Sequence, residues 1–194
     1  MKKLDPTKID WMTPDAIARW SFADESHDPA KWLDCALALR RAASTLRKHA
    51  KPHSSRSRRF SFAHAFRAQE LMLRGMAVEC LLKCIAIARK RLWRKWQARA
   101  GYPAWLPSHD LVALAAEASL PLSEADFRIC RTLTEYITWR GRYPTPRAYA
   151  ADAGSLDWLA PSERDLGRLE SRVRKLAVEK VSTAEVGLDG CPDS

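Results

Sequence analysis

Residues 75–88 read GMAVECLLKCIAIA, and they belong to a longer stretch, from about residue 62 to residue 96, in which apolar residues recur at intervals of a helical turn. An α-helix has 3.6 residues per turn, so this spacing places the apolar residues along one side of a helix. A helix with such a side must bury it against other elements. The residues on that side are Leu71, Val78, Leu81, Leu82, Ile85 and Leu92.

A second helix is predicted before this one, from Asp28 and Pro29 to about residue 50. Aspartate is a good N-cap, and proline suits the first helical position because its missing N–H would be unpaired there anyway. The motifs SEAD at 123–126 and SERD at 162–165 are typical of capping boxes and predict two further helix starts. The apolar stripe of the helix after Asp28 consists of Trp32, Ala36, Leu39, Ala43 and Leu46.

Shorter helical segments complete the pattern. HDLVALAAEA at 109–118 predicts a helix that Ser108 can cap, and the helix after SEAD is expected to turn Phe127 and Cys130 toward the core. No internal repeat is present, and no alternation of apolar and polar residues indicates a sheet. The predicted fold class is therefore all-α, an up-and-down helical bundle of about five helices.

The 194 residues fit one domain that is large enough to bury its own core. We expect an N-terminal arm with a short helix at 1–27, the helical bundle at 28–181 and a disordered tail at 182–194. The start, MKKLDPTKID, has no apolar run after its lysines, and no segment is apolar enough to span a bilayer. The expected location is the cytoplasm, with no membrane contact.

The net charge is +10, which attracts polyanions such as RNA but equally suits an acidic protein partner. Five cysteines without a CxxC pair argue against a disulfide framework or a zinc ribbon. Cys80 and Cys84 could share a metal with His109, but buried thiols packed as small apolar side chains are favoured. We therefore predict no metal and no cofactor. The chain also lacks the phosphate-binding loop, nucleophile elbow and zinc-protease motifs.

Three pieces in this order resemble the HEPN superfamily: GMAVECLLKCIAIA at 75–88, SHDLVALAAEASL at 108–120 and LTEYITWRGRYPTP at 133–146. Members of that superfamily commonly show a Glu and a Lys one turn apart, then a His-Asp-Leu helix start, then a helix that ends near an aromatic residue and Arg-Tyr-Pro. The matching positions are Glu79, Lys83, His109, Asp110, Leu111, Tyr136, Arg142, Tyr143 and Pro144. The resemblance implies a HEPN-like helical bundle, frequently a homodimer.

Ribonucleases of that superfamily carry Arg, four to six residues, and then His, and the histidine supplies the proton carrier for cleavage. At the expected place this chain reads WRGRYPTPRAYAAD, with Arg140 and Arg142 but no histidine. We therefore expect a non-catalytic RNA-binding or protein-interaction module, and the resemblance places it in a bacterial toxin–antitoxin or defence system.

Two alternatives remain. A metal-independent endoribonuclease toxin would use Arg59 with His64 or Arg47 with His53, which have the required separation elsewhere in the chain. A purely structural protein would instead bind an acidic partner such as an antitoxin or a nucleotidyltransferase-like protein.

The candidate binding residues also have structural interpretations. Glu79 and Lys83 are spaced for an ordinary surface ion pair, or they flank a groove with Arg140 or Arg142. A structural role at the start of a helix is favoured for His109 and Asp110. A second RNA surface would combine phosphate attraction with base stacking, although its tryptophans could equally pin a helix end to the bundle. Its residues are Arg91, Trp93, Arg94, Lys95, Trp96 and Arg99.

Overall fold

The structure is a computed structural model that describes residues 26–49, 62–90, 103–140 and 161–186. Helices account for 84% of the described residues, which contain no strand, and this confirms the prediction of an all-α helical bundle. None of the described helices has the length and apolar character needed to cross a membrane. The elements are α2 (Pro29–His49), α3 (Phe62–Lys90), α5 (Leu111–Glu117), α6 (Glu124–Glu135), the π-helical turn η2 (Tyr136–Arg140) and α7 (Glu163–Val186).

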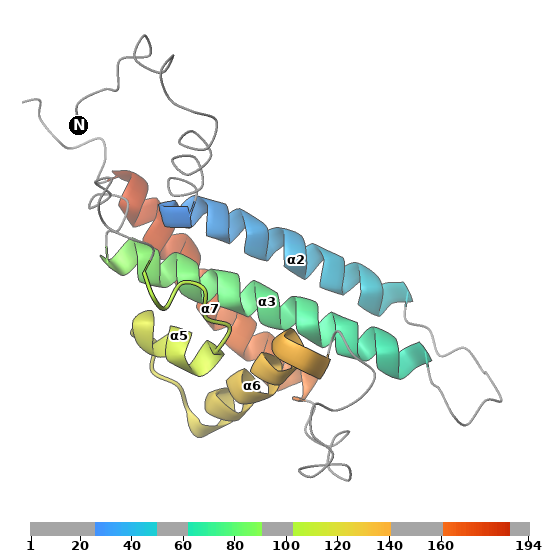
Figure 1. The fold of residues 1–194 in the computed structure, drawn as a ribbon. Helices are drawn as coiled ribbons and strands as arrows, with labels where there is room; N and C mark the ends of the chain where they lie inside the picture. The colour runs from blue at the N-terminus through green and yellow to red at the C-terminus, as the bar shows by residue number, and fades with distance from the viewer. Residues whose placement is uncertain (1–25, 50–61, 91–102, 141–160, 187–194) are drawn as a thin grey trace, which may run out of the picture.

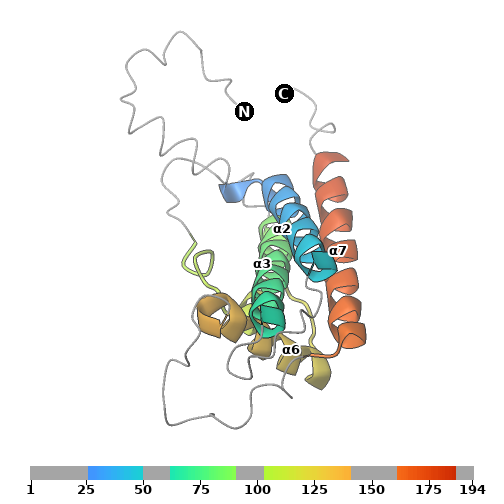
Figure 2. The same cartoon turned by 90° about the vertical axis from the view of Figure 1, so that its right-hand side faces the viewer.

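The central element is α3, and every other described helix packs on it. The end of α2 and the start of α3 lie at the same end of the bundle, so these two helices run antiparallel, whereas α7 runs alongside α3 in the same direction (Figure 1). In Figure 2, α7 lies on one side of α3 and η2 lies on the opposite side. The helices α5 and α6 complete the bundle on the side of η2.

Because it is enclosed in this way, α3 is buried around its whole circumference over residues 77–88 and not along one side as the spacing predicted. Every residue from 77 to 88 is buried, including the charged residues Glu79 and Lys83. The stretch is almost entirely apolar or small apart from these two residues, which is the composition of a helix that packs on several neighbours.

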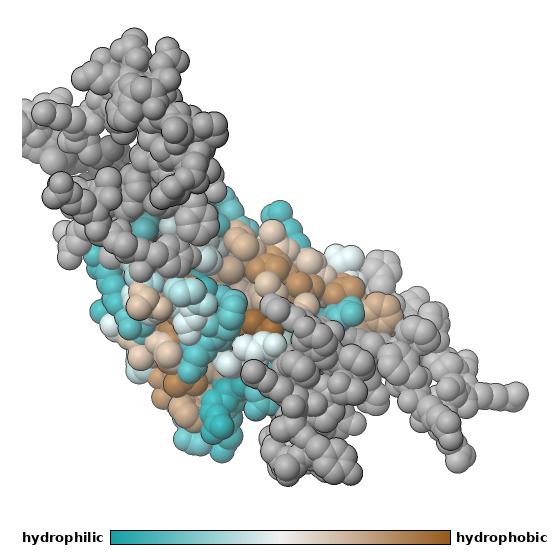
Figure 3. Space-filling view, viewed as in Figure 1, coloured by the Kyte–Doolittle hydropathy of each residue, from teal (hydrophilic) through white to brown (hydrophobic). Residues whose placement is uncertain are grey.

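Small residues let α2 approach α3 closely. Ala36 and Ala43 of the predicted stripe are buried, while Trp32 and Leu39 are half-buried against the core. The alanines themselves remove little apolar surface from water, and the half-buried Trp32 and Leu39 add apolar contact beside them. On the face seen in Figure 1, apolar residues gather along α2 and α3 (Figure 3).

The helix starts largely follow local capping chemistry. The hydroxyl of Ser123 accepts from the backbone N–H of Asp126, whose carboxylate accepts from the N–H of Ser123, so the predicted capping box of α6 is confirmed. In α7, the N–H of Asp165 donates to the hydroxyl of Ser162 at 3.1 Å, and that hydroxyl donates to the Asp165 carboxylate at 2.6 Å. These bonds satisfy backbone groups that the first turn of a helix leaves unpaired.

Three sequence-based expectations need correction. The N-cap of α5 is Asp110 and not Ser108, whose hydroxyl instead accepts from the Asp110 N–H. Phe127 is 37% exposed and does not face the core, because the buried side of α6 passes through neighbouring positions such as Ile129 and Leu133. Helix α7 continues to Val186, beyond the predicted end of the bundle.

Candidate functional site

The carboxylate of Glu79 joins α3 to the start of α5. Lys83 Nζ donates to Glu79 Oε1 at 2.6 Å, and His109 Nδ1 lies 3.0 Å from Glu79 Oε2. The exposed fractions of the Lys83 and Glu79 side chains are 4% and 8%, against 51% for His109. One buried carboxylate is therefore shared between a buried ammonium and an imidazole that reaches the surface. We call Glu79, Lys83 and His109 the α3–α5 cluster.

The interpretation of Glu79 and Lys83 as a surface ion pair is wrong. The spacing of four residues is as predicted, but the enclosure of α3 removes both charges from water. A buried charge without a partner costs several kcal/mol, whereas a paired one costs far less, so each residue requires the other to remain ionised in the core.

Trp32 of α2 completes the surroundings of Lys83. The ammonium lies 5.1 Å from the centroid of the indole ring, within the range of a cation–π interaction. The indole N–H donates to the backbone oxygen of Ser26 at 2.9 Å, which fixes the ring. Lys83 is thus held between an anion and an aromatic face, and its charge is directed inward.

Of the three residues in the α3–α5 cluster, His109 is the one whose side chain is accessible at the surface. A carboxylate at Nδ1 orients the imidazole, and about half of the side chain remains accessible. Among the described residues, no arginine is hydrogen-bonded to His109 or Glu79, so the cluster lacks a cation that could polarise a phosphate beside the ring.

Asp110 has the structural role that the sequence favoured. Its carboxylate accepts from the backbone N–H groups of Val112 at 2.9 Å and Ala113 at 3.2 Å, and it therefore caps α5. A negative charge at this position also interacts favourably with the positive end of the helix dipole.

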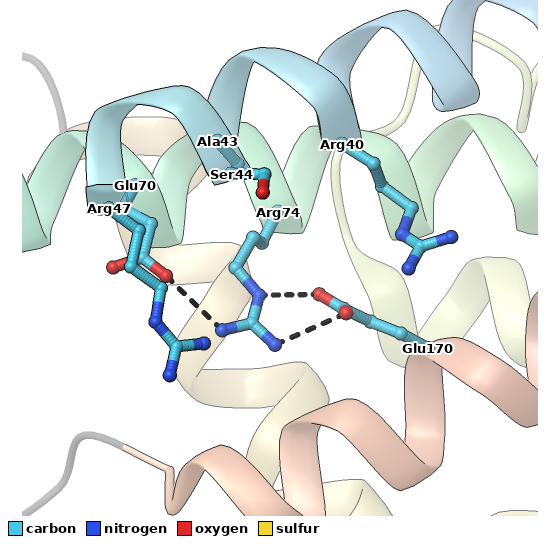
Figure 4. Close-up of a pocket in the computed structure, with 7 residues that line it drawn as sticks. All are labelled: Arg40, Ala43, Ser44, Arg47, Glu70, Arg74 and Glu170. Carbon is cyan, nitrogen blue, oxygen red and sulfur yellow. Dashed lines mark hydrogen bonds and ion pairs between the residues drawn. The ribbon is translucent and has the colours of Figure 1, made fainter. Parts of the chain in front are cut away.

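A second charged cluster, which we call the Arg74 cluster, lies where α3 faces α7. Arg74 makes a two-pronged contact with Glu170, through Nε at 2.6 Å and Nη2 at 3.1 Å, and its Nη1 also reaches Glu70 at 3.3 Å (Figure 4). Glu163 accepts from the same Nη1 at 2.8 Å, and it also pairs with Arg67 at 2.5 Å. Three carboxylates on two helices thus surround one buried guanidinium.

The pKa values of Arg74 and Glu163 are shifted toward the charged forms of both residues. Burial alone would lower the pKa of Arg74, but hydrogen bonds and attraction from Glu170 and Glu163 raise it above its ordinary value. Burial alone would raise the pKa of Glu163, but Arg74 and Arg67 lower it. Both shifts favour the charged forms of Arg74 and Glu163, so these two residues are an ion pair near neutral pH.

A pocket of about 140 Å³ opens beside the Arg74 cluster. Figure 4 shows Arg40 and Arg47 extending from α2 on either side of Arg74, with Arg40 toward Glu170 and Arg47 beside Glu70. The pocket carries both signs of charge, and its carboxylates already bind Arg74. The lining residues are Arg40, Ala43, Ser44, Arg47, Glu70, Arg74 and Glu170.

Arg47 belongs to this network, since its Nη1 donates to Glu163 Oε2 at 2.6 Å. The ribonuclease alternative would use Arg47 with His53, but the Arg47 side chain is occupied by this contact. His53 lies outside the described residues. Arg59 of the other proposed pair also lies outside them. His64 belongs to α3, but its side chain is not among those described.

Four cations lie on two adjacent rows of α2. A separation of seven residues is about two helical turns, so Arg40 lies in line with Arg47, and Arg41 lies in line with Lys48. Arg41, Arg47 and Lys48 are exposed and Arg40 is half-buried. We call these four residues the basic face of α2. Sequence reasoning overlooked it by following the apolar stripe of this helix, although the repeated Arg-Arg and Arg-Lys pairs were a visible signal.

The buried cysteines are free thiols packed in the core. Cys80, Cys84 and Cys130 are all buried. Burial raises the pKa of Cys84 and of Cys130 to about 12, so both stay protonated and behave as small apolar side chains. In the part of the chain that the structure describes, no group of three His, Cys, Asp or Glu residues could hold a metal ion.

The remaining predicted site residues fall outside the described side chains. Arg140 ends η2, but its side chain is not described. Arg142 and Tyr143 lie in the following segment, outside the described residues, so the proposed groove with Glu79 and Lys83 stays a prediction. The whole second RNA surface also lies outside them, namely Arg91, Trp93, Arg94, Lys95, Trp96 and Arg99.

Comparison with protein-family models, with curated proteins and with solved structures finds no match to this chain. The HEPN resemblance therefore rests on the three sequence pieces alone.

Proposed function

We propose that the chain is a HEPN-like helical bundle that binds RNA without cleaving it, and that the basic face of α2 contacts the RNA backbone. The observation that carries this proposal is the exposure of Arg41 and Lys48, neither of which forms an ion pair with a described residue. Cations that have no protein partner are available to replace the counterions of a phosphate backbone.

The spacing of the basic face suits a polyanion. Arg41 and Lys48 are exposed and lie two helical turns apart, about 10 Å along the helix, whereas Arg47 of the same face is bonded to Glu163. The net charge of +10 adds long-range attraction that speeds the encounter with RNA. Contacts of this kind bind RNA without reading its sequence, so the proposal specifies a polyanion of this class and no particular sequence.

Three observations favour binding over cleavage. Arg47, a candidate catalytic arginine, is bonded to Glu163. Lys83 is paired with Glu79 in the core and cannot reach a surface phosphate. The chain also lacks a histidine at the place where the HEPN ribonuclease motif would put it, and metal-independent cleavage needs such a proton carrier.

The resemblance supplies the setting of the proposal. A homodimer, a cytoplasmic location and a toxin–antitoxin or defence system are what HEPN-like proteins commonly have. An acidic partner, such as an antitoxin or a nucleotidyltransferase-like protein, would compete with RNA for the basic face because both would bind through negative charge.

The test is an RNA-binding titration across a salt series. Purified protein is mixed with labelled single-stranded and structured RNA in chelator, and both binding and cleavage are followed. The double variant Arg41→Glu, Lys48→Glu should bind about tenfold or more weakly, and the slope of log K against log salt should fall by about 1.4 for two lost phosphate contacts. The matched control is Arg128→Glu, Arg131→Glu on α6, which makes the same change in net charge at two exposed positions.

An equal loss in both double variants would reduce the effect to net charge and remove the assignment to α2. Cleavage in chelator that disappears in His64→Ala would replace the proposal with the endoribonuclease alternative. Neither binding nor cleavage would instead leave the partner-binding alternative, which a pull-down with the acidic partner would then examine.

A further inference from the structure

Two cysteines of antiparallel helices meet at the surface of the bundle. Cys35 of α2 is exposed, Cys80 of α3 is 6% exposed, and the Cys80 thiol donates to Cys35 Sγ with 3.7 Å between the two sulfur atoms. We propose that Cys35 and Cys80 form a site of reversible oxidation, at which a peroxide converts the two thiols to a disulfide that joins α2 to α3. This inference is independent of the proposed function.

The geometry favours a bond between these sulfur atoms. They are already in van der Waals contact, and a disulfide of about 2.05 Å requires an approach of about 1.6 Å, which rotation of the two side chains can supply. The neighbouring Ala36 is fully buried, and its small side chain lets the two backbones lie close at this point. Little backbone movement is therefore needed.

The difference in exposure sets the order of the chemistry. Hydrogen peroxide reaches the exposed Cys35 thiolate first and transfers one oxygen to it, giving a sulfenic acid and hydroxide, which is released as water. The Cys80 sulfur then attacks the Cys35 sulfur; the S–O bond breaks, the S–S bond forms, and the hydroxyl group leaves as a second water with the Cys80 proton. The two thiols lose two electrons in total, and the peroxide gains them.

The surroundings of Cys80 agree with its role as the second thiol. Burial raises its pKa, the nearby Cys35 and Glu79 raise it further and Lys83 lowers it, so the Cys80 thiol is protonated and is not the first to react with peroxide. The other described cysteines, Cys84 and Cys130, are buried and have no exposed thiol beside them in the described part of the chain.

Oxidation would fix α2 on α3 close to the α3–α5 cluster. Cys80 follows Glu79 directly in the chain, and Trp32, which covers Lys83, lies one turn before Cys35 on α2. A covalent link would add a constraint to the apolar packing of α2, in which Ala36 and Ala43 are buried and Trp32 is half-buried.

The experiment uses the full chain with Cys191→Ser, so that the cysteine near the C-terminus cannot react. The reduced protein is treated with hydrogen peroxide, its free thiols are alkylated, and the intact mass and peptide map are measured. We expect the intact mass of a single chain with two fewer alkylated thiols, and a peptide that links Cys35 to Cys80. Dithiothreitol should restore both thiols and remove the linked peptide. The control Cys130→Ala should form the same link.

The variant Cys80→Ala separates the two steps. It should leave Cys35 as a sulfenic acid that dimedone traps, because the resolving thiol is missing. The proposal would be overturned if, in the parent protein, Cys35 were over-oxidised while Cys80 remained a free thiol and was therefore alkylated. A disulfide between the Cys35 residues of two chains would overturn it equally.

Discussion

Arg74 is buried between α3 and α7, and its stability there depends on three carboxylates. Its side chain is 9% exposed, while those of Glu70 and Glu170 are 6% and 7% exposed. Buried ion pairs gain little over a well-packed apolar replacement, but the removal of one partner leaves the others as uncompensated buried charges. The main contribution of the Arg74 guanidinium to stability is therefore to neutralise the charges of the buried carboxylates around it.

We expect Arg74→Met to lower the free energy of unfolding by about 3 kcal/mol or more, because the methionine fills part of the space but leaves Glu170 without this cation and leaves Glu70 with Arg67 alone. Urea unfolding followed by circular dichroism measures the change. The control is Arg168→Met, since Arg168 is 60% exposed and lies 3.5 Å from Asp165, and it should cost less than about 1 kcal/mol. Equal effects of the two variants would contradict the importance assigned to burial.

At the scale of residues, the sequence predicted the members of the α3–α5 cluster but not their burial. The one-turn spacing of Glu79 and Lys83 is the same in a surface pair and in a core pair, so only the packing of other helices on α3 distinguishes the two. In the Arg74 cluster only the pairs within α3 have a local signal, the spacing of Glu70 from Arg67 and from Arg74. Arg74 and Glu170 are 96 residues apart, and no periodicity indicates that two such positions will meet.

Gly75 and Gly167 form a matched pair at the scale of helices. Both lie inside helices, where alanine is favoured over glycine by about 1 kcal/mol. A Cβ added at Gly75 would lie 2.9 Å from Cγ1 of Ile137 and 3.3 Å from the backbone oxygen of Leu133. A Cβ added at Gly167 would meet nothing within 4 Å. Gly75 is thus the position that lets η2 approach α3.

Gly167→Ala should raise the free energy of unfolding by about 1 kcal/mol through helix propensity alone. Gly75→Ala should lower it by about 1 to 2 kcal/mol, because the overpacking of η2 against α3 outweighs that gain. Thermal and urea unfolding of both variants test the pair. A stabilising effect of Gly75→Ala would show that η2 moves aside freely and that its packing on α3 does not depend on glycine.

Helix starts were predictable because their chemistry is local. The Ser123 capping box spans only four residues, so the sequence contains the whole interaction. The start of α5 was harder, since Ser108 and Asp110 are both good caps and the outcome depends on where the chain leaves the preceding turn. The exposure of Phe127 was harder still, because it follows from how α6 is rotated about its axis when it packs on α3.

In the whole molecule, charged side chains lie both at the surface and in the interior of the bundle. Arg41 and Lys48 of the basic face of α2 are exposed to solvent, whereas the Arg74 and α3–α5 clusters hold charges inside and link helices that are distant in the chain. Composition predicted the first kind of charge and could not predict the second, because a net charge of +10 does not say which cations are neutralised by neighbours. The interior ion pairs make the bundle sensitive to pH.

Two carboxylates give that sensitivity a direction. Burial alone would raise the pKa of Asp126, but hydrogen bonds from Ser123 and the charge of Arg172 lower it, and Arg74 and Arg67 likewise lower the pKa of Glu163. In the unfolded chain both groups titrate near pH 4. Between that pH and the lower native pKa values, the unfolded state binds more protons, so the free energy of unfolding falls as the pH falls.

We expect these two groups to contribute fully to stability above about pH 5 and to lose that contribution progressively as the pH drops through their native pKa values. Glu163→Gln should flatten the acid side of the stability curve, because the amide neither titrates nor gains from Arg74 and Arg67. Glu179→Gln is the control: Glu179 is 58% exposed and lies beside Lys180, so its removal should leave the slope unchanged. Urea unfolding at a series of pH values measures both slopes. If the acid slope of Glu163→Gln is as steep as that of the parent protein, the ion pairs of Glu163 with Arg47, Arg67 and Arg74 add nothing to the pH dependence of folding. The acid sensitivity would then come from other carboxylates.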